Sequence, residues 1–153
     1  MQKITDKRVV NALAILFSLT YMVSYITRIN YGAVIAEMVT GTGMTKSMLS
    51  LAVTGSFITY GTGQVISGII GDKISPKRLV SIGRCITVLM NVAIPFSESP
   101  YLMLAIWCIN GFAQSLMWPP LVRLMTTLLL AEDYKNAATK VSGGSSFGTI
   151  AVY

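Results

Sequence analysis

Long stretches without a charged residue dominate this sequence and restrict it to a small set of folds. Residues 9–27, 47–71 and 99–122 contain no Asp, Glu, Lys or Arg, and residues 79–97 contain only Arg84. A helix needs about 20 apolar residues to cross the hydrocarbon core of a bilayer. Because backbone polar groups must find their partners within the lipid, such stretches fold as spanning helices. The sequence therefore predicts an all-α, polytopic transmembrane helix bundle.

The composition agrees with a membrane protein and argues against other classes. Charged residues make up 12% of the chain, whereas soluble domains carry about 25%. The net charge of +6 is compatible with nucleic-acid binding, but the basic residues cluster at the ends of the apolar runs, as the positive-inside rule describes. We therefore expect the lipid bilayer as the surroundings and no nucleic-acid partner. Both cysteines, Cys85 and Cys108, lie inside apolar runs and histidine is absent, so we expect no metal site, disulfide or cofactor.

The charge-free windows divide the chain into expected spans. These are residues 9–29, 47–70, 79–97, 100–122 and 141–153. The last is too short to cross a bilayer at a rise of about 1.5 Å per residue, so we expect an incomplete chain that ends within its fifth span. Basic residues accumulate before the first span and in the turn after the second. The amino terminus is therefore expected to be cytoplasmic, in a multi-pass protein of the cell (inner) membrane.

Arg28 is the sharpest candidate for a binding residue. It follows nineteen uncharged residues, and the apolar pattern continues beyond it, so a helix from Val9 to about Val39 would place it within the span. Tyr21, Tyr25 and Arg28 share one helical stripe. An arginine inside a membrane is costly and usually faces a water-filled cavity or an anion. The alternative is a span that ends near Thr27, with Arg28 as an interfacial anchor.

Two further polar stripes also have two interpretations each. Asn110, Gln114 and Trp118 recur at intervals of four before the Pro119–Pro120 pair, which bends or breaks the helix. Tyr60 and Gln64 form a similar pair in the second span. Such side chains either line a binding cavity or hydrogen-bond to neighbouring helices.

The turn after the second span is a third candidate. It contains Asp72 after the helix-ending Gly71, and basic residues on both sides of Ser75–Pro76. The basic residues alone are explained by topology. An aspartate at a helix carboxyl end, however, is unfavourable with the helix dipole unless another group compensates it. A contact that does so can form in one conformation and break in another. The residues of this expected switch are Gly68, Asp72, Lys73, Lys77 and Arg78.

No pattern typical of catalysis is present. The sequence has no nucleophile with a neighbouring histidine and no nucleotide-binding loop. We therefore expect a protein that is not an enzyme.

Three motifs resemble the major facilitator superfamily. Gly68-x-x-x-Asp72-Lys73 followed by Lys77-Arg78 is similar to the loop between its second and third helices. Residues 25–30 (Tyr-Ile-Thr-Arg-Ile-Asn) and residues 110–123, with their Trp-Pro-Pro run, resemble the organophosphate:phosphate antiporter branch, which includes glycerol-3-phosphate and hexose-6-phosphate transporters. The match covers nearly the whole chain.

The resemblance implies an alternating-access carrier of two six-helix halves. This chain would supply part of the amino-terminal half, with four complete spans and the start of a fifth, and the carboxyl-terminal half would be missing. In the family, the arginine at the position of Arg28 binds the phosphoryl group, and tyrosines matching Tyr21, Tyr25 and Tyr60 line the same cavity. Gln64 stands where the glycerol-phosphate carrier has a lysine, which leaves other small anions possible as substrates. The expected site consists of Arg28, Tyr21, Tyr25, Tyr60, Gln64 and Gln114.

The expected function is exchange of a phosphorylated metabolite against phosphate. One rival is a membrane sensor that detects an external sugar phosphate and signals to a partner kinase, because some relatives of these carriers do so. Another is a small homo-oligomeric exporter, but that class requires a carboxylate within the membrane, and no span contains one near its middle.

Overall fold

The computed structural model describes residues 3–153, and within them every regular element is helical. The elements are α1 (Lys7–Ala33), α2 (Ile35–Thr42), α3 (Lys46–Gly71), α4 (Pro76–Ala93), the 3₁₀ turn η1 (Ile94–Phe96), α5 (Pro100–Ser115), α6 (Trp118–Leu128) and α7 (Ala131–Ile150). The expected all-α fold is confirmed.

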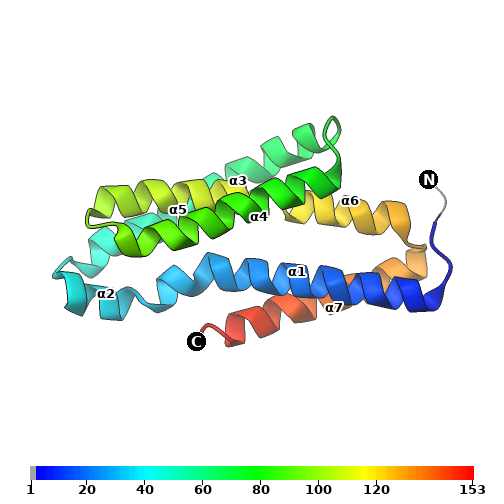
Figure 1. Cartoon of the computed structure of the whole chain (residues 1–153), viewed down its shortest axis with the longest axis horizontal. Helices are drawn as coiled ribbons and strands as arrows, with labels where there is room; N and C mark the ends of the chain where they lie inside the picture. Colours follow the sequence, from blue (N-terminus) through cyan, green and yellow to red (C-terminus); the bar gives the residue numbers. More distant parts are fainter. Residues whose placement is uncertain (1–2) are drawn as a thin grey trace.

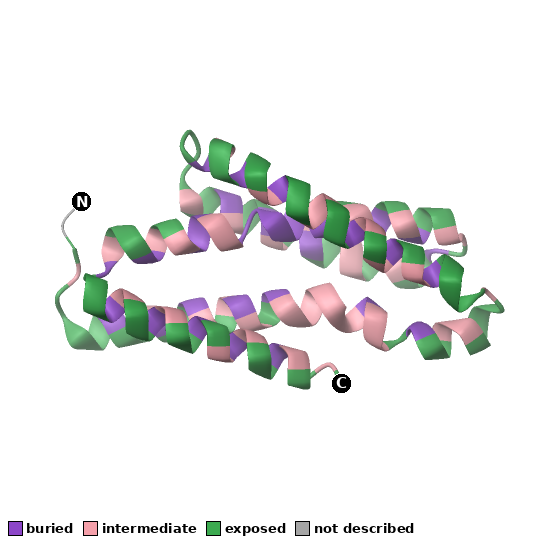
Figure 2. Ribbon diagram, turned by 180° about the vertical axis from the view of Figure 1, so that it is seen from behind, coloured by how far each residue is buried: buried purple, intermediate pink, exposed green. Residues whose placement is uncertain are grey.

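The helices form two groups that lie along each other. α1 and α7 are paired on one side of the molecule, and α3, α4 and α5 pack together on the other, with α6 continuing from α5 (Figure 1). The short α2 connects one group to the other. It lies at one end of the molecule, and α6 lies towards the opposite end (Figure 1). Figure 2 shows exposed residues along the outer faces of the helices. Many of them are large apolar residues, as lipid-facing surfaces require.

Within residues 3–153, three segments have both the length and the hydropathy of membrane spans. They are Lys7–Ala33, Pro76–Phe96 and Pro100–Leu128. α3 contains 26 residues and is long enough, but its serines, threonines and glycines lower its hydropathy. That α3 also crosses the membrane stays a prediction, which its close packing against α5 supports.

One expectation about helix limits needs correction. A continuous helix to Val39 is wrong, because α1 ends at Ala33 and Val34 separates it from α2. Near this break the Asn30 side chain accepts a bond from the Tyr31 amide at 2.9 Å, and such side chains compete with helical hydrogen bonding. The helix that contains most of the fifth expected span is α7, which already begins at Ala131 because its first turns are charged; the span itself, residues 141–153, stays a prediction.

Prolines set the other breaks as expected. α5 ends at Ser115 and α6 begins at Trp118, because Pro119 and Pro120 lack the N–H groups that would bond to the preceding turn. α4 begins with Pro76 after Ser75, whose side chain caps the helix by accepting from the Arg78 amide.

Glycines allow the closest helix contacts. In α7, a Cβ on Gly144 would lie 2.6 Å from the Ser18 carbonyl oxygen, and one on Gly148 would lie 2.6 Å from that of Met22. These glycines are four residues apart, the small-xxx-small spacing with which membrane helices bring their backbones together. Gly111 of α5 approaches the Ser56 carbonyl of α3 in the same way.

The buried residues form two apolar clusters with a polar layer between them. The first cluster joins α1, α6 and α7 through Val10, Ala14, Phe17, Tyr21, Leu121, Met125, Leu129, Ala137 and Val141. The second joins the end of α1 to α2, α3 and α5 through Tyr31, Ile35, Leu49, Ala52, Met103, Ile106 and Trp107. The α1 segment between Tyr21 and Tyr31 lies between the clusters, and it carries Arg28.

Candidate functional site

Arg28 lies more than one turn before the end of α1, so the helix does not stop near Thr27. Its guanidinium carbon is 4.4 Å from the ring centroid of Tyr25 and 4.4 Å from that of Tyr60. The cation therefore bridges α1 and α3 through two aromatic faces, an interaction that strengthens where water is excluded. Neither ion pair among residues 3–153 involves Arg28, and its Nε is buried without a hydrogen-bond partner.

The two predicted tyrosines of α1 lie beside this cation. Tyr21 and Tyr25 pack edge to face with their centroids 5.1 Å apart. Tyr21 also packs on Trp118, at 4.7 Å. Trp118 is the first residue of α6, so this contact connects the aromatic stripe of α1 to the proline break. Gln64 lies one turn after Tyr60 on α3 and is half-buried, on the same face of the helix.

Gln114 points to α1, but its polar groups already have partners. Its side-chain oxygen accepts from the Ser24 hydroxyl, and its Nε2 donates to the Thr27 hydroxyl oxygen at 3.0 Å. All three are buried or half-buried. In this conformation Gln114 joins α5 to α1, one turn before Arg28.

Asparagines extend this polar layer. Asn91 of α4 and Asn110 of α5 both donate to the Thr27 carbonyl oxygen, at 3.1 and 3.2 Å. Asn30 donates to Asn91 Oδ1 at 2.8 Å. Thr27 thus receives bonds from two other helices immediately before Arg28. Sequence reasoning missed Asn91, Ser24 and Thr27 as members of this layer. The available signal for Asn91 was that it is the one asparagine of residues 79–97.

The predicted switch residues lie at the turn between α3 and α4, away from Arg28. Arg123 of α6 donates to the Gly71 carbonyl, and the same nitrogen lies 3.4 Å from Asp72 Oδ1. The guanidinium thereby compensates both the helix end and the aspartate. Gly68 lines a small pocket here with Pro119 and Pro120, whereas Lys73, Lys77 and Arg78 are exposed. The sequence did not indicate which residue would meet Asp72.

The residues that the structure describes contain no group of His, Cys, Asp or Glu side chains suited to a metal ion. The chemistry available near Arg28 is instead that of a cation with aromatic and hydroxyl neighbours. A planar guanidinium binds carboxylate or phosphate oxygens with paired hydrogen bonds.

Comparison of the sequence with known proteins identifies the family of this chain. The sequence profile of the Major Facilitator Superfamily matches residues 17–153. The chain belongs to the Major Facilitator Superfamily. No solved structure gives a significant match.

Individual relatives indicate to which branch of the superfamily this chain is similar. It is 32% identical over 108 residues to a probable hexose phosphate transport protein of Chlamydia trachomatis, covering 71% of this chain and 24% of the relative. It is 31% identical over 131 residues to the membrane sensor protein UhpC of Salmonella typhimurium, covering 80% and 30%. With the glycerol-3-phosphate transporter of Bacillus subtilis, identity is 30% over 87 residues, covering 54% and 20%.

These relatives confirm the predicted organophosphate:phosphate antiporter branch. The matches span only 20% to 30% of the length of these three relatives.

Proposed function

We propose that this chain forms part of a secondary transporter that carries a small phosphorylated organic anion across the cell membrane by alternating access. Inorganic phosphate is the counter-substrate. Two of the relatives, a probable hexose phosphate transport protein and a glycerol-3-phosphate transporter, support this substrate class. The relatives are several times longer than the matched segments, so the chain works together with further spans that supply the other wall of the site.

One observation carries the proposal. Arg28 is a cation within an apolar helix, it forms no ion pair with any described carboxylate, and its Nε has no partner. The tyrosine faces stabilise the positive charge, but they leave its hydrogen-bonding groups available to an anion. We infer that the phosphoryl group binds Arg28 and that hydroxyls of Tyr21, Tyr25 and Tyr60 and the amide of Gln64 contact the rest of the anion. Gln114 would join them only by exchanging its present partners.

The remaining expectations complete the proposal. The amino terminus and the turn carrying Asp72 face the cytoplasm, in accordance with the distribution of basic residues. Gly68, Asp72, Lys73, Lys77 and Arg78 form a switch whose contact with Arg123 stabilises one facing state. The protein carries out no covalent chemistry on its substrate and uses no cofactor.

Exchange by the full-length protein tests the proposal. Proteoliposomes loaded with phosphate should take up labelled glucose 6-phosphate or glycerol 3-phosphate. Arg28→Lys should weaken binding at least about tenfold, because a lysine cannot form the paired hydrogen bonds and a charge-assisted bond contributes about 1.5–3 kcal/mol. Arg8→Lys, at the exposed first turn of α1, is the matched control. Unchanged affinity in Arg28→Lys would show that Arg28 does not anchor the anion.

The same experiment separates the second candidate function. The match to the sensor protein UhpC covers more of this chain than the matches to the two carriers reported above, which favours a sensor of an external sugar phosphate as the alternative. A sensor would bind the sugar phosphate in an Arg28-dependent manner but would exchange no label across the vesicle membrane.

A further inference from the structure

Two grooves border the side of α1 that faces away from the proposed transport site. The first lies between α1 and α4 and has a volume of about 500 Å³, and the second lies between α1 and α7 and has a volume of about 380 Å³. Leu19 of α1 lines both, so the grooves form one trough with α1 as its floor. At 3.6 residues per turn, Leu19 lies about 180° around α1 from Arg28. The trough is therefore separate from the aromatic stripe that carries Arg28.

Apolar side chains form most of the surface of this trough. Ile15, Leu19 and Val23 line its floor, and Phe147 of α7 lines one wall. These four residues are between 39% and 70% exposed. The other sides of α1 are packed against α7 or lie within the two apolar clusters and the polar layer. The floor of the trough is thus an apolar face of α1 that no helix within residues 3–153 covers.

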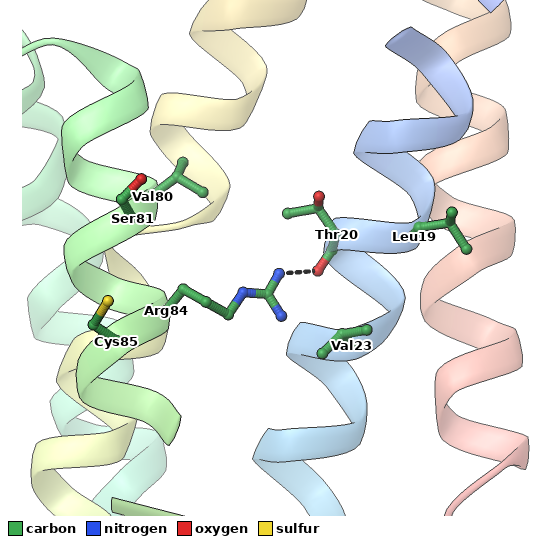
Figure 3. A pocket seen from close by; sticks show the side chains of 7 residues that line it. All are labelled: Leu19, Thr20, Val23, Val80, Ser81, Arg84 and Cys85. Atoms are coloured by element: carbon green, nitrogen blue, oxygen red, sulfur yellow. Dashed lines mark hydrogen bonds between the residues drawn. The ribbon is translucent and has the colours of Figure 1, made fainter. Parts of the chain in front are cut away.

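Arg84 brings a positive charge into the middle of the trough. It reaches from α4 towards α1 and donates to the Thr20 carbonyl oxygen at 2.5 Å (Figure 3). Arg84 and Thr20 lie at the middle of their helices, α4 (Pro76–Ala93) and α1 (Lys7–Ala33). Both helices have the length and hydropathy of membrane spans. The guanidinium is therefore close to the middle of the membrane and not at the depth of the lipid headgroups.

Most of the hydrogen-bonding capacity of Arg84 is unused. A guanidinium has five N–H donors, and one carbonyl oxygen leaves most of them available. No carboxylate among residues 3–153 lines either groove, and the two ion pairs within these residues involve Lys7 and Arg123. Charged residues at this depth are costly beside lipid tails and usually pair with another charged group of the protein. Arg84 therefore requires an acceptor that lies outside the described part of the chain.

We propose that a further membrane helix of the full-length protein packs into this trough and places an aspartate or glutamate opposite Arg84. An acyl chain of a lipid would cover the apolar floor, but it carries no hydrogen-bond acceptor at this depth. A helix supplies both an apolar face for Leu19 and Val23 and a carboxylate for the guanidinium, which binds carboxylates with paired hydrogen bonds. The relatives are several times longer than the matched segments, so such a helix is available in a protein of their length.

Oxygen collisions of a spin label test whether protein covers the trough. Leu19→Cys is introduced into a full-length protein from which the other cysteines have been removed, labelled with a nitroxide and placed in lipid bilayers. We expect the label to lose most of the oxygen collisions of a lipid that carries a nitroxide at the middle of its acyl chain. It should also collide rarely with a water-soluble nickel chelate, because the trough is packed and not hydrated.

Neutralising the charges tests the ion pair. Arg84→Gln in the full-length protein should lower the midpoint of thermal unfolding by at least about 5 °C, because removing one member of a buried pair leaves the other charge unpaired. A second substitution, Asp→Asn or Glu→Gln at the partner in the further helix, should restore more than half of this loss. Arg8→Gln, which removes an exposed arginine at the start of α1, is the matched control and should leave the midpoint nearly unchanged. If Arg84→Gln does not fold, recovery of folded protein by the same second substitution is the expected result.

Three results would overturn the proposal. Oxygen collisions at Leu19→Cys as frequent as those of the labelled lipid would show that lipid fills the trough. Frequent collisions with the nickel chelate would show that the trough is an aqueous cavity. If no acidic residue within a further span restores the stability of Arg84→Gln, Arg84 has no carboxylate partner. None of these results depends on the substrate of Arg28, so this proposal and the proposed function can fail separately.

Discussion

At the scale of single residues, Thr27 explains how α1 holds Arg28 in place. Its carbonyl accepts from Asn91 and Asn110, and its hydroxyl accepts from Gln114. Water is scarce at this depth, so polar groups that lose a partner here are not readily compensated. Two other helices, α4 and α5, thus bond to Thr27, the residue immediately before Arg28.

Gln114 gives the residue-scale prediction. Gln114→Ala removes the acceptor of the Ser24 hydroxyl and the donor to the Thr27 hydroxyl oxygen. Because hydrogen bonds between membrane helices contribute about 0.6 to 2 kcal/mol, we expect a lower midpoint of thermal unfolding in detergent. Gln64→Ala removes the same group from a half-buried glutamine whose side chain forms no hydrogen bond within residues 3–153, and it should leave the midpoint nearly unchanged. Equal midpoints for the two variants would contradict the structural role of Gln114.

The residues around Arg28 show what neighbouring positions in the sequence could and could not predict about the site. The stripe of Tyr21, Tyr25 and Arg28 followed from helical spacing alone, and the ring distances agree with it. Whether Gln114 faces a cavity or another helix could not be decided, because both uses require a polar side chain on the inner face. The position of its partners on α1 shows the second use in this conformation.

At the scale of elements, glycine positions determine which helices approach most closely. Gly143 and Gly148 lie on the same helix, yet a Cβ on Gly143 meets nothing within 4 Å, whereas one on Gly148 lies 2.6 Å from a backbone oxygen of α1. Composition cannot distinguish them, because each is simply a glycine in a small-residue run. Only the pairing of α7 with α1 gives them different roles.

The element-scale prediction is that alanine substitutions at Gly143 and Gly148 change the stability of the protein in different directions. Gly143→Ala should be neutral or stabilising by up to about 1 kcal/mol, because alanine loses less backbone entropy in a helix. Gly148→Ala should be destabilising, because the α1 backbone must move away to admit the methyl group. Thermal unfolding of both variants of the full-length protein checks this. A stabilised Gly148→Ala would mean that α7 does not pack on α1 as described.

At the scale of the whole molecule, Arg123 connects α6 to the end of α3. It contacts the end of α3 and Asp72 from α6. The pair is largely exposed, with side-chain exposures of 45% for Arg123 and 83% for Asp72. Exposed pairs add little to folding stability. Its importance would therefore lie in the choice between conformations, which differ by small free energies.

Asp72→Asn tests this role in the full-length protein. We expect the dissociation constant of the labelled sugar phosphate to change less than about threefold, while the rate of exchange against phosphate falls at least about tenfold, because the variant shifts the balance of facing states without touching Arg28. Glu98→Gln, an exposed carboxylate in the turn before α5, is the matched control. A normal exchange rate in Asp72→Asn would show that Asp72 does not influence the change between facing states.

The sequence by itself determined the helical class, the proline breaks and the aromatic stripe with Arg28. Each of these depends on the length of apolar runs, on missing N–H groups or on the helical period, which are properties of neighbouring residues. The charged start of α7 was missed because hydropathy does not reveal a helix that begins outside the lipid.

Only the tertiary structure decided which polar groups meet. Tyr60 on Arg28, Asn91 on Thr27 and Arg123 on Asp72 join residues from different helices. The physical reason is that every inward-facing polar side chain needs a partner, but its own sequence position does not say which helix will supply it.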